Sequence, residues 1–392
     1  MPISSGRSGR SGRSGRSGRT IGTATDIADE IFEHAGGESS YLMGEALIVQ
    51  RDALVQNDEI TPDSGKGNAQ HSTGRMLQLD QVYRASVVHS ELTEEVRVKT
   101  TASTPGGANE VTIFSSSSGG TDQPICRIIR PDLSDFERDA ALVASYADLR
   151  DDRLPEIDIQ ISDQLSFFGA VTPLQPAGFK WTLEMISAAL DWSTMLAQRV
   201  KIALGCPRPE LFSPLIQPVI QTPSHGAFPS GHSTQAHMIA ALLTALRFPD
   251  HEVEPLPHDR APDEHVLQLF RLASRVAINR TVAGVHYPSD SASGAIIGIS
   301  LARLLVARAR NALKEDSEAD MAATGYAFDG SAYALDACEP RRSRDYDINE
   351  LAHLMKGDAA ATPLGAPVTP LPAPLFAVLW SKASEEWKHR WG

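Results

Sequence analysis

The longest periodic pattern of apolar residues lies in the second half of the chain. Over residues 177–204, apolar side chains recur at helical spacing, at Trp181, Met185, Ala188, Trp192, Met195 and Val200. Pro173 and Pro176 predict a break just before this helix. Similar patterns predict further helices over residues 133–151, 157–168, 233–246, 265–281 and 289–313. We therefore expect a mainly α-helical core over residues 131–315, with Trp181 and Trp192 as core anchors.

The first third of the chain has shorter patterns. Helical periodicity appears over residues 23–34 and 40–56. From residue 81 the pattern changes to short β-prone runs separated by Ser, Thr, Gly and Pro, at residues 82–88, 95–100, 109–114 and 125–129. We therefore expect residues 21–130 to form an N-terminal extension of helices and short strands that packs on the core.

The two ends of the chain differ from the core in composition. Residues 4–19 repeat Ser-Gly-Arg, which cannot form a core and lacks the apolar stretch of a secretory signal, so residues 1–20 are predicted to be a disordered basic arm. Residues 363–374 are Pro-rich and precede an apolar segment with Trp380 and Trp387. We expect residues 316–392 to be a tail that docks on its own body or on a sister subunit, and hence a homo-oligomer.

Composition narrows the class of protein. The chain has 392 residues, 42% of them hydrophobic, which is enough for one large domain with arms. A net charge of −13 argues against a nucleic-acid surface. No stretch reaches the eighteen uncharged apolar residues of a membrane span, so a soluble, cytoplasmic protein is the default expectation. Three cysteines are too few for a disulfide framework, and Cys206 is interpreted as a small buried residue.

Three short motifs within about ninety residues carry the candidate chemistry. They are Lys201-x6-Arg208-Pro209, Pro229-Ser230-Gly231-His232 and Arg280-x5-His286-x3-Asp290. The two arginines offer planar forks of donors, and the lysine adds a compact point charge. Three cations beside two imidazoles are suited to holding a tetrahedral oxyanion of the phosphate type.

The other residues of the motifs complete this site. Ser230 provides a hydroxyl donor, and Gly231 lets its backbone N–H approach an anion at the start of the predicted helix 233–246. His286 and Asp290 lie four residues apart, so the carboxylate can fix the imidazole tautomer and leave the other ring nitrogen as a ligand or nucleophile. The sequence has no His-Glu-x-x-His, Cys-x-x-Cys, phosphate-cradling Gly-Lys-Ser/Thr loop or Gly-x-Ser-x-Gly elbow.

In this order, the three motifs resemble the signature shared by vanadium-dependent haloperoxidases and the type-2 phosphatidic acid phosphatase / bacterial acid phosphatase superfamily. The resemblance covers about residues 190–310, and one departure is Asn279, where the family has Ser. It implies the helical bundle of that superfamily, with short β-strands in the N-terminal part here. It also implies that vanadate, or phosphate in the same site, is held by Lys201, Arg208, Ser230, Gly231, His232 and Arg280, with His286 bonded to the metal.

Two chemistries remain open within this resemblance. A haloperoxidase would use vanadate as cofactor, and halide, hydrogen peroxide and a small organic acceptor as partners, with His232, His225, Lys201 and Asp290 as catalytic residues. His225 lies seven residues before His232, where bromide-oxidising members of the family carry a second histidine. It favours a bromide (and iodide) peroxidase. In the alternative, a soluble acid phosphatase, His286 would attack phosphorus and His232 would protonate the leaving alkoxide.

Overall fold

The computed structural model describes residues 41–54, 73–104, 107–249, 263–315, 317–334, 346–357 and 360–391. The predicted basic arm (1–20) and the predicted helix 23–34 lie outside these residues. The chain divides into a smaller compact unit, residues 21–87, and a larger one that contains residues 88–392. In the smaller unit, α2 (Tyr41–Leu54) confirms the helical pattern at 40–56, and a short 3-10 helix spans Thr73–Gln78.

The strand predicted at 82–88 is wrong, because these residues lie in a helix, α3 (Gln81–Glu94). The β-branched residues of this segment suggested a strand. However, Val88 and Leu92 are both fully buried and lie four positions apart, which is the spacing of one helix face. Burial of this face against the core has overridden the local β preference.

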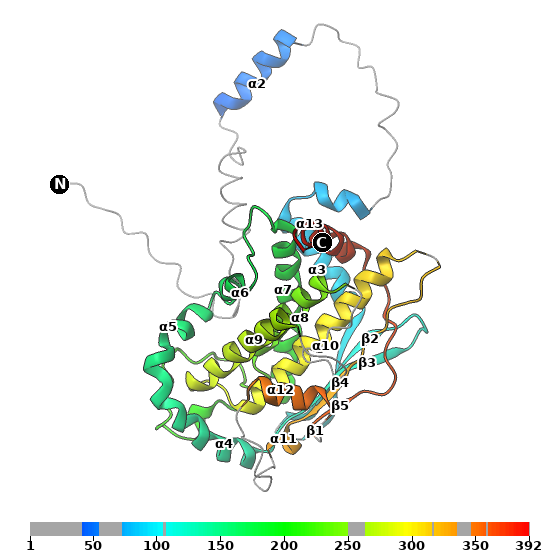
Figure 1. Ribbon diagram of the computed structural model, residues 1–392. Helices are drawn as coiled ribbons and strands as arrows, with labels where there is room; N and C mark the ends of the chain where they lie inside the picture. Colours follow the sequence, from blue (N-terminus) through cyan, green and yellow to red (C-terminus); the bar gives the residue numbers. More distant parts are fainter. Residues whose placement is uncertain are drawn as a thin grey trace, which may run out of the picture. The chain divides into compact units, whose positions relative to one another are not determined.

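A five-stranded mixed sheet follows, in the order β1-β2-β3-β4-β5 (Figure 1). The antiparallel strands β1 (Val96–Thr104), β2 (Gly107–Ser116) and β3 (Asp122–Ile129) confirm the three other predicted runs. The last two strands come from the opposite end of the chain: β4 (Tyr326–Asp329) pairs parallel with β3, and β5 (Ala361–Pro363) pairs antiparallel with β4. The strands are therefore not confined to the N-terminal part, as the sequence had indicated.

The rest of the larger unit is mainly helical, as predicted. The helices that position the site agree with the periodic patterns to within three residues at either end: α7 (Lys180–Leu204), α8 (Gly231–Arg247), α9 (Glu264–Val282) and α10 (Pro288–Leu313). The predicted helix 157–168 is instead two helices, α5 (Arg150–Gln160) and α6 (Leu165–Val171). The remaining elements are α4 (Leu133–Ser145), the 3-10 turns Tyr146–Leu149 and Pro209–Leu211, α11 (Gly330–Ala334), α12 (Ile348–Met355) and α13 (Pro374–Trp391).

Helices α8 and α10 pack against each other at the centre of this unit. Two glycines of α10 allow the close approach: a Cβ at Gly294 would lie 2.5 Å from the Ser230 carbonyl oxygen, and one at Gly298 would lie 2.3 Å from that of Thr234. Among the described residues, α10 is the one helix long and apolar enough to cross a membrane, and its apolar stretch is entirely buried inside the protein. Of the two predicted core anchors, Trp192 is fully buried, whereas Trp181 is only partly buried.

Helix α13 is attached to the core by two carboxylates. Glu91 of α3 accepts the N–H groups of Leu375 and Phe376 at the start of α13, each at 2.9 Å. Glu386 of α13 in turn accepts the N–H groups of Trp181 and Thr182 at the start of α7, each at 2.8 Å. Each acceptor satisfies helix N–H groups that have no partner within their own helix.

Candidate anion-binding site

The three sequence motifs meet where four helix ends come together. Lys201 and Arg280 lie in the last turns of α7 and α9, while α8 begins at Gly231 and α10 at Pro288. The N–H of Ser230 donates to the carbonyl oxygen of Asp290 (2.8 Å) and so joins the two helix starts. The helix dipole favours cations at helix C-termini, and the free N–H groups at helix N-termini attract anions.

Lys201 is almost fully buried. Its Nζ donates to the carbonyl oxygens of Gly226 (2.9 Å) and Ala227 (2.8 Å). Burial, together with the positive charge of Arg208, lowers the pKa of Lys201 to about 7. A neighbouring anion would remove much of this cost, because it would replace the hydration that the ammonium group has lost.

Arg208 connects the two histidines His225 and His286. Its guanidinium donates to the carbonyl oxygens of His225 (3.1 Å) and Val285 (2.6 Å). It also lies 3.1 Å from Nε2 of His286 and 3.1 Å from Nδ1 of His225. A guanidinium can only donate, so Nε2 of His286 acts as an acceptor and carries a lone pair, whereas Nδ1 of His225 also lies 3.2 Å from the carbonyl oxygen of Gly226.

His286 takes its orientation from Asp290. Its Nδ1 donates to Oδ2 of Asp290 at 2.7 Å, and the N–H of Tyr287 donates to the same oxygen at 3.0 Å. Burial and the charges of Arg208 and Lys201 hold the pKa of His286 well below its usual value. Burial also raises the pKa of Asp290 to about 7, against the effect of the Tyr287 N–H and the two cations. His286 is therefore a neutral imidazole whose Nε2 lone pair faces Arg208.

Arg280 and His232 both contact Gln160. One terminal nitrogen of Arg280 donates to the carbonyl oxygen of Ile157 (3.0 Å) and to Oε1 of Gln160 (3.2 Å). The other terminal nitrogen and Nε are buried without a partner among the described residues. Nε2 of His232 donates to the main-chain oxygen of Gln160 (3.1 Å). Burial and Arg280 lower the pKa of His232 well below its usual value, so the ring is neutral.

Ser230 and Gly231 form the start of α8. Ser230 is the N-cap, and its Oγ accepts the N–H of Ser233 at 3.3 Å. The hydroxyl proton of Ser230 remains available for another acceptor. The N–H of Gly231, in the first turn, has no acceptor within the helix. Both groups thus retain donor capacity at the point where α8 meets α10.

The charges of this site call for an anion. In the described part of the chain, none of Lys201, Arg208 and Arg280 is ion-paired with a carboxylate, since their acceptors are carbonyl, amide and imidazole groups. Asp290 is engaged by His286. Within the motifs three buried cations face the single carboxylate of Asp290, and this surplus of positive charge is costly unless a multiply charged anion balances it. The buried donors of Arg280 that have no partner could donate hydrogen bonds to the oxygens of a vanadate or phosphate ion.

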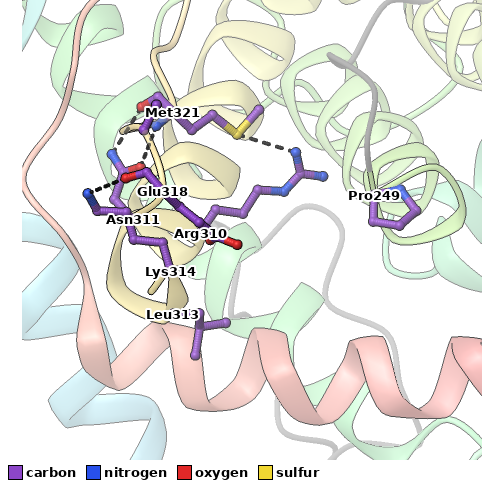
Figure 2. Close-up of a pocket in the computed structure, with 8 residues that line it drawn as sticks. Pro249, Arg310, Asn311, Leu313, Lys314, Glu318 and Met321 are labelled. Carbon is purple, nitrogen blue, oxygen red and sulfur yellow. Dashed lines mark hydrogen bonds between the residues drawn. The ribbon is translucent and has the colours of Figure 1, made fainter. Parts of the chain in front are cut away.

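Two further features of the described residues concern sites outside the anion-binding site. Among the described residues, no group of three or more His, Cys, Asp or Glu side chains could hold a bare metal ion. A hollow of about 480 Å³ lies at the other end of α10, lined by Arg310, Lys314 and Met321 among others (Figure 2). It lies roughly 30 Å along the helix from Asp290. Its polar groups bond mainly to one another, so the predicted chemistry belongs to the anion-binding site and not to this hollow.

Sequence reasoning missed Gln160, which no motif identifies. Asn279, the departure from the family pattern, donates to Oε1 of Gln160 and to Glu156, each at 3.0 Å.

His237, one turn into α8, bonds to the Ser233 carbonyl oxygen (2.8 Å) and to the hydroxyl of Tyr346 (2.7 Å), which gives it a structural role. Cys206 is buried, as interpreted.

Comparison with known proteins agrees with the motifs at the level of the superfamily. Residues 185–314 match the family model of the PAP2 superfamily. A stretch of 91 aligned residues is 32% identical to a vanadium-dependent bromoperoxidase of Ascophyllum nodosum. This match covers 20% of the present chain and 16% of the algal protein, so the chain spans only a small part of that relative's length.

Proposed function

We propose that this protein is a vanadate-dependent haloperoxidase that oxidises bromide, and iodide, with hydrogen peroxide. The product would be a hypohalous acid, which halogenates small organic acceptors. The observation that carries this proposal is the position of Arg208 between His225 and His286, 3.1 Å from a ring nitrogen of each. This contact brings a second imidazole next to the anion-binding residues, and the similarity to a bromoperoxidase supports the same reading.

Residues from all three motifs would hold the vanadate. Lys201, Arg208 and Arg280 would neutralise its charge, Ser230 and Gly231 would donate hydrogen bonds, and His286 would bond to the metal through Nε2. Bound vanadate would supply a Lewis acid that activates peroxide toward attack by the halide. The role of the protein is to fix the anion, to keep His286 neutral and to provide bases for proton transfer.

His225 and His232 are the bases that we assign to proton transfer. Burial and the charge of Lys201 lower the pKa of His225 to about 4, so its ring is neutral and able to accept a proton from hydrogen peroxide. His232 is neutral for a similar reason, and it carries a proton on the nitrogen that faces Gln160. We assign to His232 the exchange of protons with the oxygens of the bound anion.

The alternative function is a phosphatase, and one observation favours it as much as the peroxidase. The lone pair on Nε2 of His286, directed by Asp290, is also suited to attack on phosphorus. Arg208, which touches this nitrogen, would stabilise charge on the transferring group. His232 would then protonate the leaving alkoxide.

A paired assay tests both functions. Protein stripped of metal is assayed for bromination with bromide and peroxide, before and after addition of orthovanadate, and in parallel for cleavage of phosphate esters. Activity that appears only with vanadate and is competed by phosphate supports the haloperoxidase. Ester cleavage without vanadate-dependent bromination would instead establish the phosphatase.

A further inference from the structure

Gln160 contacts both Arg280 and His232, although it lies outside the three motifs and outside the matched segment 185–314. It is the last residue of α5 and is fully buried. Its main-chain oxygen accepts from Nε2 of His232 at 3.1 Å, while its side-chain Oε1 accepts from Arg280 at 3.2 Å. One residue thus holds a cation and a candidate acid–base residue of the anion-binding site.

Neighbouring donors fix the orientation of the Gln160 amide. Arg280 can only donate, so the atom that faces it is the amide oxygen. Asn279 donates its Nδ2 to the same oxygen at 3.0 Å, and its own Oδ1 accepts from Arg153 at 3.0 Å. Nε2 of Gln160 is consequently turned away from Arg280, and it is buried without a partner among the described residues.

A carboxylate on this part of α5 lies one helical turn before Gln160 and is bonded to another arginine. Glu156, four residues before Gln160 on α5, accepts both donors of Arg275 at 2.6 and 2.8 Å, and also accepts from Asn279 at 3.0 Å. Arg275 is exposed at the surface, and its charge is balanced there. Arg280 faces a neutral amide instead, so no carboxylate of the described residues pairs with its charge.

We propose that Gln160 is a positioning residue that orients Arg280 and, as a neutral acceptor, leaves the charge of Arg280 available to a multiply charged oxyanion. This inference rests on the anion-binding site assumed in the proposed function. A carboxylate at position 160 would pair with Arg280 and reduce the surplus of positive charge in the site. A phosphate-like anion would then have to compete with that carboxylate.

Calorimetric titration of the full-length protein with inorganic phosphate, and separately with orthovanadate, tests this role without turnover. Gln160→Glu should weaken binding of both anions at least tenfold. Gln160→Met, which keeps the length and neutrality of the side chain but removes Oε1, should weaken it about threefold. Gln164→Glu is the matched control: Gln164 is equally buried, and its amide donates to Gln235 (3.1 Å) and not to a cation of the site. This control should bind within about threefold of the wild type.

Each outcome decides a separate point. Equal losses in Gln160→Glu and Gln164→Glu, or in Gln160→Glu and Gln160→Met, would overturn the charge argument. If Gln160→Glu fails to fold, the test rests on Gln160→Met. A phosphate Kd of Gln160→Met equal to that of the wild type would then overturn the positioning role. A wild type that binds neither anion would overturn the anion-binding site itself and this inference with it. A wild type that binds, with Gln160→Glu unchanged, would overturn only the role of Gln160.

Discussion

Nδ1 of His286 lies 2.7 Å from Oδ2 of Asp290, four residues later in the chain. The same oxygen accepts the N–H of Tyr287, so the carboxylate is held at the start of α10 by the backbone as well as by the imidazole. The consequence is that Nε2 of His286 is the nitrogen without a proton, on the side of the ring that faces Arg208.

This relationship predicts different effects for the two histidines of the motifs. His286→Ala should weaken vanadate binding at least ~100-fold, because it removes the nitrogen that bonds the metal. His232→Ala should change vanadate Kd by less than about tenfold but lower turnover on the order of 10²-fold or more, because it removes a proton-transfer group. Retained vanadium, measured by elemental analysis after dialysis, is compared with kcat. Equal loss of bound vanadium in both variants would contradict the division of roles.

His225→Ala should lower bromide oxidation by about tenfold or more and leave vanadate binding nearly unchanged. The reason is that His225 contacts Arg208 through Nδ1 but is assigned to proton transfer and not to the metal. The measurement is kcat/KM for bromide across the pH range, with His353→Ala, an exposed histidine of α12, as the control. A rate for His225→Ala equal to the wild type at every pH would show that the assigned base role is wrong.

Anion affinity should fall as pH rises through about 7. In the anion-free protein Lys201 has a pKa lowered to about 7, so its charge is present below that pH and lost above it. Asp290, with a pKa raised to about 7, gains negative charge over the same range and acts in the same direction. Sulfate is a suitable probe because its own charge is constant near neutrality, and its Kd should rise above pH 7 by up to about tenfold per pH unit for each of the two groups that titrates.

Lys201→Arg provides the comparison for this profile, because arginine keeps its charge throughout the range. We expect a flatter dependence of sulfate Kd on pH in this variant. A profile as steep as that of the wild type would assign the titration to Asp290 alone.

Close packing of α8 and α10 predicts that Gly298→Ala destabilises the fold. The new Cβ would lie 2.3 Å from the carbonyl oxygen of Thr234. This oxygen belongs to the main chain of α8, so relief of the clash would require the two helices to move apart. We expect a loss of about 2 kcal/mol or more in the free energy of unfolding, measured in denaturant. Gly169→Ala in α6 is the control: its Cβ would have nothing within 4 Å, so it should be neutral or stabilising. A neutral Gly298→Ala would contradict the packing argument.

The long helices could be predicted because each combines a strong apolar period with a clear end signal. The start of α8 follows the N-cap Ser230, and α7 ends at Leu204, directly before Gly205, which adopts a left-handed conformation (φ 59°). β4 and β5 escaped prediction because they are only four and three residues long, and they exist through pairing with strands far away in the sequence. Such pairing leaves no local pattern.

In the site, too, residues with a local sequence pattern could be predicted and residues defined by long-range contacts could not. The charged residues of the motifs could be predicted because their types and their spacing in the sequence indicate an anion-binding site. Gln160 could not, because a single glutamine at the end of a polar helix has no distinguishing pattern. Its importance arises from contacts with Arg280 and His232, which lie 120 and 72 residues later in the chain.

The position of Glu386 near the end of the chain affects how α7 forms during protein synthesis. It accepts the first N–H groups of α7, the helix that carries Lys201, from a position more than two hundred residues further along the chain. A ribosome releases residues in order, so α7 leaves it long before this acceptor has been made. Until Glu386 emerges, the start of α7 must rely on water for these hydrogen bonds. The hydrogen bonds from the start of α7 to Glu386 are therefore long-range contacts that form only after almost the whole chain has been synthesised.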